Sequence, residues 1–110
     1  MPGMGFRVEL TPQAEEMYYR CLEYLLYYVG GVGNAQAAQN FVDGYERVLD
    51  LLEINAEGCG FLEDEKFRAE GYRKIHFEHM SYKVVFHLER ETAIVDAVFH
   101  DKQDMRKWLE

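Results

Sequence analysis

The stretch Gly71–His100 decides the fold, and it reads GYRKIHFEHMSYKVVFHLERETAIVDAVFH. It contains three runs rich in β-branched and aromatic residues, which are typical of strands: Gly71–Phe77, Tyr82–Leu88 and Thr92–His100. In the middle run, apolar Tyr82, Val84 and Phe86 alternate with Lys83 and His87. Only short turn segments separate the runs, so they predict a three-stranded antiparallel meander.

The segment before this stretch predicts a strand followed by two helices. Phe6–Leu10 alternates apolar and charged residues, as a half-buried strand does. Thr11 and Pro12 are typical of a helix start. Apolar residues then recur at spacings of three and four over about five turns, until Gly30–Gly33 ends the helix. A second apolar stripe, which Asn34 can cap, continues to about Ile54 and predicts an antiparallel helical hairpin.

The remaining segments are expected to be irregular. Asn55–Ala69 has no periodicity and carries the acidic triplet Glu63–Glu65, so it predicts a loop. Asp101–Leu109 predicts a short C-terminal helix or tail. The order strand, helix, helix and three strands predicts a single α+β domain over residues 1–110, with a helical hairpin on one face of the sheet in two layers. The face without helices is where we expect the site.

Composition and charge exclude several classes of protein. The 110 residues are 48% hydrophobic and 15% aromatic, which argues against intrinsic disorder. The longest uncharged apolar run, Tyr24–Val32, is too short to cross a bilayer, and no secretory signal pattern is present. Together with only two cysteines, these features predict a cytoplasmic protein. The net charge of −8 argues against a general polyanion binder, although residues 66–87 carry a local balance of +3.

Several local patterns resemble the RelE/ParE superfamily of bacterial toxins, and the resemblance extends from Phe6 to about Met105. They are the segment Asn34–Ala38 followed by Phe41, the strand Gly71–Ile75 with its Tyr-Arg pair, the strand Tyr82–Phe86, and Val98–His100 with Gln103 and Asp104 behind it. The resemblance implies the toxin of a type II toxin–antitoxin system, of the kind linked to plasmid stabilisation and growth inhibition. RelE-like members are endoribonucleases that cleave mRNA on the ribosome. ParE-like members inhibit DNA gyrase without chemistry of their own.

Our first interpretation is a metal-independent endoribonuclease, with two alternatives left open. One is a ParE-like inhibitor of gyrase, which the acidic net charge favours because ribosome binding needs cationic surfaces. The other is a degenerate, non-toxic member that binds only an antitoxin. The resemblance implies no metal and no cofactor.

The resemblance and the residue types together suggest a catalytic set. Arg73 matches the arginine of the family's Tyr-Arg strand and is the candidate phosphate clamp, because guanidinium binds phosphate in a bidentate manner. A structural ion pair with Glu70, Glu78 or Asp96 is the competing interpretation. His100 and His87 are the candidate acid–base groups, since histidine exchanges protons near neutral pH. The candidate substrate-binding residues are Lys66, Arg68, Lys74 and Lys83.

The expected partner is a cognate antitoxin. The resemblance implies that it wraps the toxin with helical or extended segments. The five tyrosines between Tyr18 and Tyr28 exceed what one buried stripe can use, which favours a surface for a protein partner. The outer face of the second helix is acidic, so we expect basic residues on the antitoxin opposite it. A homodimer and a monomer are both compatible with the sequence, and no membrane partner is expected.

Overall fold

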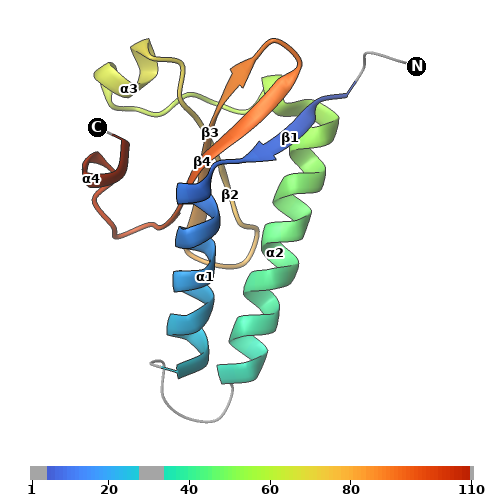
Figure 1. Ribbon diagram of the computed structural model, residues 1–110, viewed down its shortest axis with the longest axis vertical. Helices are drawn as coiled ribbons and strands as arrows, with labels where there is room; N and C mark the ends of the chain where they lie inside the picture. Colours follow the sequence, from blue (N-terminus) through green and yellow to red (C-terminus); the bar gives the residue numbers. More distant parts are fainter. Residues whose placement is uncertain (1–4, 28–33, 110) are drawn as a thin grey trace.

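The computed structural model describes residues 5–27 and 34–109 (Figure 1). Its elements follow in the order β1 (Arg7–Leu10), α1 (Pro12–Tyr27), α2 (Asn34–Asn55), the 3₁₀ turn η1 (Ala56–Gly58), α3 (Glu65–Ala69), β2 (Arg73–His76), β3 (Tyr82–Glu89), β4 (Thr92–His100) and α4 (Arg106–Leu109). The predicted α+β order is therefore confirmed. No helix in these described ranges is both long and apolar enough to span a membrane.

The three C-terminal strands pair in sequence order, as predicted. β2 pairs antiparallel with β3, and β3 pairs antiparallel with β4, from Tyr82 opposite His100 to Glu89 opposite Thr92. β1 joins the sheet next to β4 in parallel, so the strand order is β1-β4-β3-β2. The sequence predicted β1 as a strand but not its position in the sheet. A parallel pair needs a long connection, and the helical hairpin provides part of it.

α1 and α2 form the predicted hairpin, which extends well beyond the sheet at its lower end (Figure 1). The start of α1 is capped as expected, because the Thr11 hydroxyl accepts a hydrogen bond from the Ala14 N–H at 3.0 Å. The predictions of a glycine stop at Gly30–Gly33 and of a cap by the Asn34 side chain fall outside what the structure describes.

An aromatic cluster joins the hairpin to the sheet. The ring of Phe41 on α2 is fully buried and stacks on Tyr18 and Phe77, with an edge-on contact to Tyr82 on β3. Full burial of one such side chain stabilises the fold by roughly 1.5–3 kcal/mol. These contacts show that Tyr82, and with it the alternate residues of β3, points toward the helices.

The prediction of a loop over Asn55–Ala69 is wrong in part, because this segment contains η1 and α3. The Asp64 carboxylate accepts hydrogen bonds from the N–H groups of Lys66 and Phe67 and so caps α3. Acidic residues favour a helix N-terminus as well as a loop, which explains the error. The Phe67 side chain of α3 is almost fully buried, so the segment belongs to the core.

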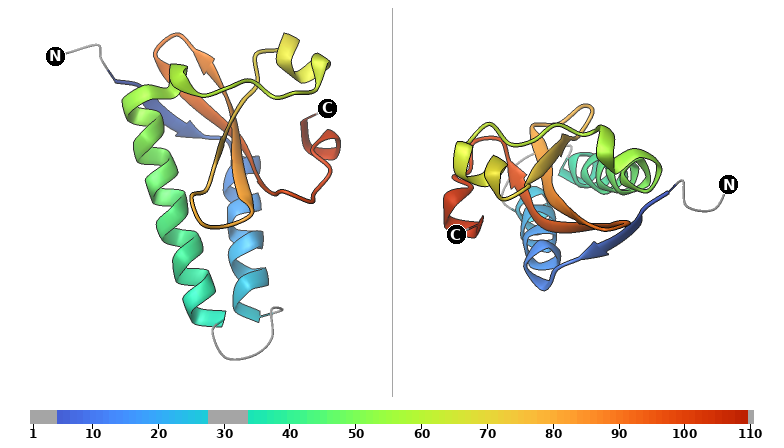
Figure 2. Two further views of the ribbon diagram at one scale, coloured as in Figure 1. Left: turned by 180° about the vertical axis from the view of Figure 1, so that it is seen from behind. Right: turned by 90° about the horizontal axis from the view of Figure 1, so that it is seen from above.

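The outer face of the sheet, opposite the hairpin, is partly covered, whereas we expected it to be bare. Val85, Ala97 and Phe99 alternate with the helix-facing residues, and their side chains are nonetheless fully buried. α3 and α4 lie side by side at the other end of the molecule from the hairpin tip (Figure 2). Partly buried Met105 and Trp108 from the α4 region pack against the core, so these small elements cover hydrophobic area whose position no local pattern in the chain predicts.

Candidate functional site

The candidate site residues occupy two faces of the sheet, and strand register decides which face each one uses. In an antiparallel pair, directly opposite residues lie on the same face. His87 lies opposite Ile94 and alternates with helix-facing Phe86, so it belongs to the outer face. Lys74, opposite Val85, and Lys83 share that face. Arg73 lies opposite Phe86 and therefore belongs to the helix side.

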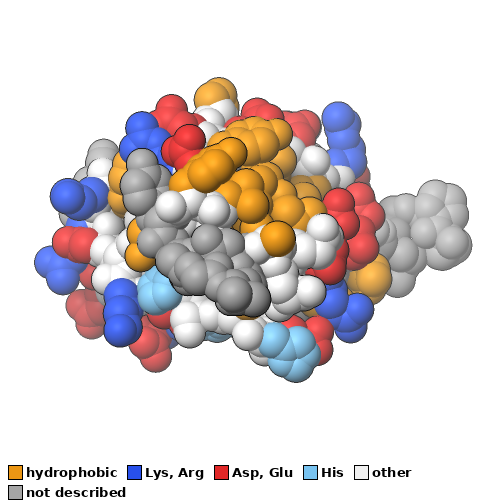
Figure 3. Space-filling view, turned by 90° about the horizontal axis from the view of Figure 1, so that it is seen from below, with side chains coloured by type: hydrophobic (Ala, Val, Ile, Leu, Met, Phe, Trp, Pro, Cys, Tyr) orange, Lys and Arg blue, Asp and Glu red, His pale blue; other side chains and the backbone are white. Residues whose placement is uncertain are grey.

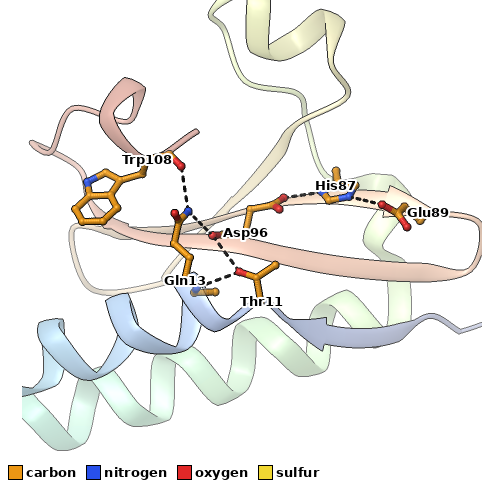
Figure 4. Close-up of polar contacts among 7 residues, drawn as sticks. Thr11, Gln13, His87, Glu89, Asp96 and Trp108 are labelled. Atoms are coloured by element: carbon orange, nitrogen blue, oxygen red, sulfur yellow. Dashed lines mark hydrogen bonds and ion pairs between the residues drawn. The ribbon is translucent and has the colours of Figure 1, made fainter. Parts of the chain in front are cut away.

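A β-bulge in β4 builds a polar cluster on the outer face. Val85 pairs with Ala97 but Phe86 pairs with Val95, which leaves Asp96 as an extra residue. The Asp96 carboxylate contacts His87, with 2.7 Å between Oδ2 and Nδ1. The other ring nitrogen, Nε2, lies 2.9 Å from the Glu89 carboxylate. His87 is thus held between two acidic side chains (Figure 4).

The backbone at the bulge is hydrogen-bonded to the start of α1, which in turn is hydrogen-bonded to the end of α4. The carbonyl oxygen of Asp96 accepts hydrogen bonds from Gln13 Nε2 at 3.0 Å and from the Thr11 hydroxyl at 3.4 Å. Gln13 Nε2 also donates to the carbonyl oxygen of Trp108 at 3.1 Å (Figure 4). The start of α1 and the end of α4 therefore meet at the residue that orients His87.

The carboxylates change the protonation of this histidine. Burial alone would lower the pKa of His87, but the hydrogen bonds to Asp96 and Glu89 outweigh burial and raise it. Burial raises the pKa of Asp96, and the histidine partly offsets that increase. The two carboxylates that flank the imidazole repel an anion, so this cluster is a poor receptor for a phosphate.

Arg73 is engaged in contacts within the fold. Its Nη1 donates to the backbone carbonyl oxygens of Glu57 and Cys59 at 3.1 and 2.8 Å. Its guanidinium carbon lies 4.1 Å from the centre of the Phe61 ring, a cation–π distance. None of the carboxylates considered as ion-pair partners contacts it among the described residues. Arg73 thus ties the η1 segment to the edge of the sheet, and its guanidinium does not face His87.

His100 lies at the opposite end of β3–β4 from His87. Tyr82, the strand partner of His100, precedes His87 by five residues, which corresponds to about 16 Å along a strand. The His100 ring packs edge-on against Tyr82, and its Nδ1 accepts a hydrogen bond from the Lys102 N–H. His100 also lines a pocket of about 420 Å³ with residues of α1, among them Arg20 and Cys21. Burial raises the pKa of the Cys21 thiol to about 11, which favours the neutral thiol over the nucleophilic thiolate.

The four candidate substrate-binding residues come from three elements, and two of them make contacts within the fold. Lys66 and Arg68 lie on α3, where Arg68 Nε donates to the Leu62 carbonyl oxygen. Lys83 is 8% exposed, and its Nζ lies 3.5 Å from the Asp101 carboxylate. Lys74 lies on the outer face of β2. Within residues 5–27 and 34–109, no group of three or more metal-binding side chains is placed to hold an ion.

The overall architecture has a counterpart among solved structures. A chain of the chromosomal ParDE TA system from P. aeruginosa matches 86% of this chain with a TM-score of 0.63, and 95% of that chain is covered. The fold is RelE/ParE-like. Sequence identity with that structure is 17%, so the likeness concerns the fold. No protein-family model and no curated protein matches the sequence. In this RelE/ParE-like domain, sequence reasoning missed Asp96, because only the bulge brings its carboxylate to His87.

Proposed function

We propose that this protein is the toxin of a type II toxin–antitoxin pair and that it acts in the cytoplasm by binding a protein target, as ParE-like inhibitors of DNA gyrase do. The observation that carries the proposal is the fold, which resembles a chain of a ParDE TA system over most of its length. A cognate antitoxin is the expected partner.

The geometry of the candidate catalytic residues favours binding over mRNA cleavage. Metal-free RNA cleavage needs a base, a phosphate clamp and an acid around one phosphate. Arg73 donates to backbone carbonyls on the helix side, whereas His87 lies on the outer face between two carboxylates. His100 lies about 16 Å from His87 along the strands. The net charge of −8 also disfavours the ribosome as a binding site.

Controlled expression in a bacterial host tests both the toxin assignment and the inhibition of gyrase. We expect growth arrest that is relieved by co-expressing the cognate antitoxin. We also expect intact transcripts, an induced DNA-damage response and inhibited supercoiling by purified gyrase. Growth without arrest would contradict the toxin assignment.

A double variant, His87→Gln with His100→Gln, separates the two mechanisms. A binding inhibitor retains growth arrest in this variant as long as it folds, because neither imidazole takes part in the inhibition. The matched control is His79→Gln, which replaces an exposed histidine in the turn before β3. Transcripts cut within minutes of induction in the wild type, and uncut in the double variant, would instead identify an endoribonuclease.

A further inference from the structure

A small pocket opens between α1 and α2, away from the candidate catalytic residues. It encloses about 230 Å³ and is lined by three tyrosines and two glutamates, Tyr18, Tyr19, Tyr45, Glu15 and Glu46, with two leucines beside them. Pockets for drug-sized ligands begin at about 300 Å³. This pocket is therefore of a size for one side chain.

One of the tyrosines that line the pocket has a buried hydroxyl without a partner. Tyr45 is 5% exposed, and its hydroxyl makes no hydrogen bond. A buried hydroxyl that lacks a partner costs about 1–3 kcal/mol, so such groups are uncommon. Burial and the neighbouring Tyr18, Glu15 and Tyr19 raise the pKa of Tyr45 well above its usual value, so the phenol is neutral. A neutral phenol has oxygen lone pairs that can accept a hydrogen bond.

The charged side chains that line the pocket are both acidic. Glu15 and Glu46 are exposed, and in residues 5–27 and 34–109 neither forms an ion pair. The nearby arginines are engaged elsewhere, Arg20 with Glu16 at 2.7 Å and Arg47 with Glu78 at 2.8 Å. Two carboxylates at the rim therefore face solvent without a cation.

The aromatic rings add a second attraction for a cation. Tyr18 and Tyr19 are in edge-on contact at 5.2 Å between ring centres, and Tyr18 lies 4.2 Å from Tyr45. Tyr19 is 62% exposed, so its ring is available to a ligand. Tyrosine faces attract ammonium and guanidinium groups. Seen from below the hairpin, hydrophobic side chains gather on one side of the surface, with acidic side chains close to them (Figure 3).

We propose that this pocket receives a lysine or arginine side chain from a protein partner. The carboxylates of Glu15 and Glu46 pair with the cation, and the Tyr45 hydroxyl accepts one of its N–H bonds. The apolar part of the side chain lies against the tyrosine rings and the leucines. The inference specifies a contact for the partner of the proposed function, and the binding pocket itself is testable without any toxicity.

A small mimic of the arginine side chain tests the pocket directly. Purified protein is titrated with n-butylguanidinium and, as the control of opposite charge, with butyrate, while the ring resonances of the tyrosines are followed by NMR. We expect saturable shifts of Tyr18, Tyr19 and Tyr45 with the cation only. Shifts spread over other acidic surfaces, or equal shifts with butyrate, would overturn the proposal.

Two variants measure separately what a carboxylate and the buried hydroxyl contribute to binding. Glu46→Gln is expected to weaken n-butylguanidinium binding at least fivefold, whereas Glu53→Gln, on the same helix and outside the pocket, removes the same charge without effect. Tyr45→Phe removes only the hydroxyl. It is expected to weaken binding about threefold. It should also raise the melting temperature, because the variant no longer buries a hydroxyl that lacks a hydrogen-bond partner. Unchanged binding in Glu46→Gln would overturn the assignment.

Two further measurements identify the source of the cation. If spermidine binds a hundredfold more tightly than n-butylguanidinium, the occupant is a free polyamine and the protein partner is wrong. If Glu46→Gln weakens binding of the neutralising protein at least fivefold and Glu53→Gln does not, the proposal is supported. Failure of the toxin assignment leaves the NMR result standing, so the two outcomes are distinguishable.

Discussion

The imidazole Nδ1 of His87 lies 2.7 Å from the Oδ2 of Asp96, across the β3–β4 pair. The contact exists because Asp96 is the extra residue of a β-bulge, which turns its carboxylate onto the outer face. Glu89 completes the cluster from the other side of the ring. The two carboxylates favour the charged form of the His87 imidazole, which gives the protein a predictable dependence on pH.

Folding stability should fall as pH rises through the pKa of His87. Burial opposes the charged imidazole, but the Asp96 and Glu89 hydrogen bonds outweigh it, so the folded pKa is above the unfolded value of about 6.5. The stability due to this group is fully present below the unfolded pKa. It is lost as pH rises through the folded pKa. Urea unfolding at several pH values checks the slope, and an NMR titration of the imidazole locates the pKa.

Asp96→Asn is the matched variant for this prediction. The amide removes the negative charge next to Nδ1, so the folded pKa of His87 should decrease and the loss of stability should move to lower pH. An unchanged imidazole titration in Asp96→Asn would contradict the assigned role of the bulge.

Arg73→Ala should destabilise the protein by about 1–3 kcal/mol, because two backbone carbonyls lose a charged donor and Phe61 loses its cation. Lys74→Ala, on the same strand, changes stability by no more than about 0.5 kcal/mol. Chemical denaturation of both variants measures the difference. Full stability in Arg73→Ala would contradict this structural role and make Arg73 a candidate for ligand binding again.

Gly44→Ala should destabilise the fold by about 1–3 kcal/mol through overpacking. A Cβ at Gly44 would lie 2.8 Å from a ring carbon of Phe77, and that ring is held by its stack on Phe41. Gly60→Ala is the control, since its Cβ would meet nothing within 4 Å. Thermal unfolding followed by circular dichroism compares the two, and equal melting temperatures would show that α2 and the turn before β3 separate easily.

Arg90→Gly should stabilise the protein by about 0.5–1 kcal/mol. Arg90 occupies the turn between β3 and β4 with φ of 59°, a left-handed conformation that costs an L-residue roughly 1–2 kcal/mol and glycine very little. Arg90→Ala retains this strain and is expected to show no gain. The comparison of melting temperatures therefore isolates the backbone effect from the loss of charge.

Much of the fold could be predicted because its signals are local. Alternation over Tyr82–Leu88 and β-rich composition over Thr92–His100 predict strands whose observed bounds agree closely. The threonine cap and the spacing of apolar residues likewise located the start of α1. The segment before β2 was misread, because Asp64 next to two glutamates is typical of both a loop and a helix start.

The candidate site was less predictable, because its geometry depends on contacts between distant segments. The residue types of Arg73, His87 and His100 suggested a shared role, but strand register places them on different faces and at different ends of the sheet. The pairing of Asp96 with His87 depends on one extra residue in β4. The pocket around Tyr45 arises only where α1 and α2 pack.

The amino-acid sequence by itself determined the strands, the two long helices, the order of these elements and the helical hairpin, since hydrophobic periodicity and capping act within a few residues. Tertiary structure alone decided the parallel addition of β1, the covering of the outer face by α3 and α4, and the direction of the Arg73 guanidinium. Those features follow from register and packing between segments far apart in the chain, where a shift of one residue reverses the face that a side chain occupies.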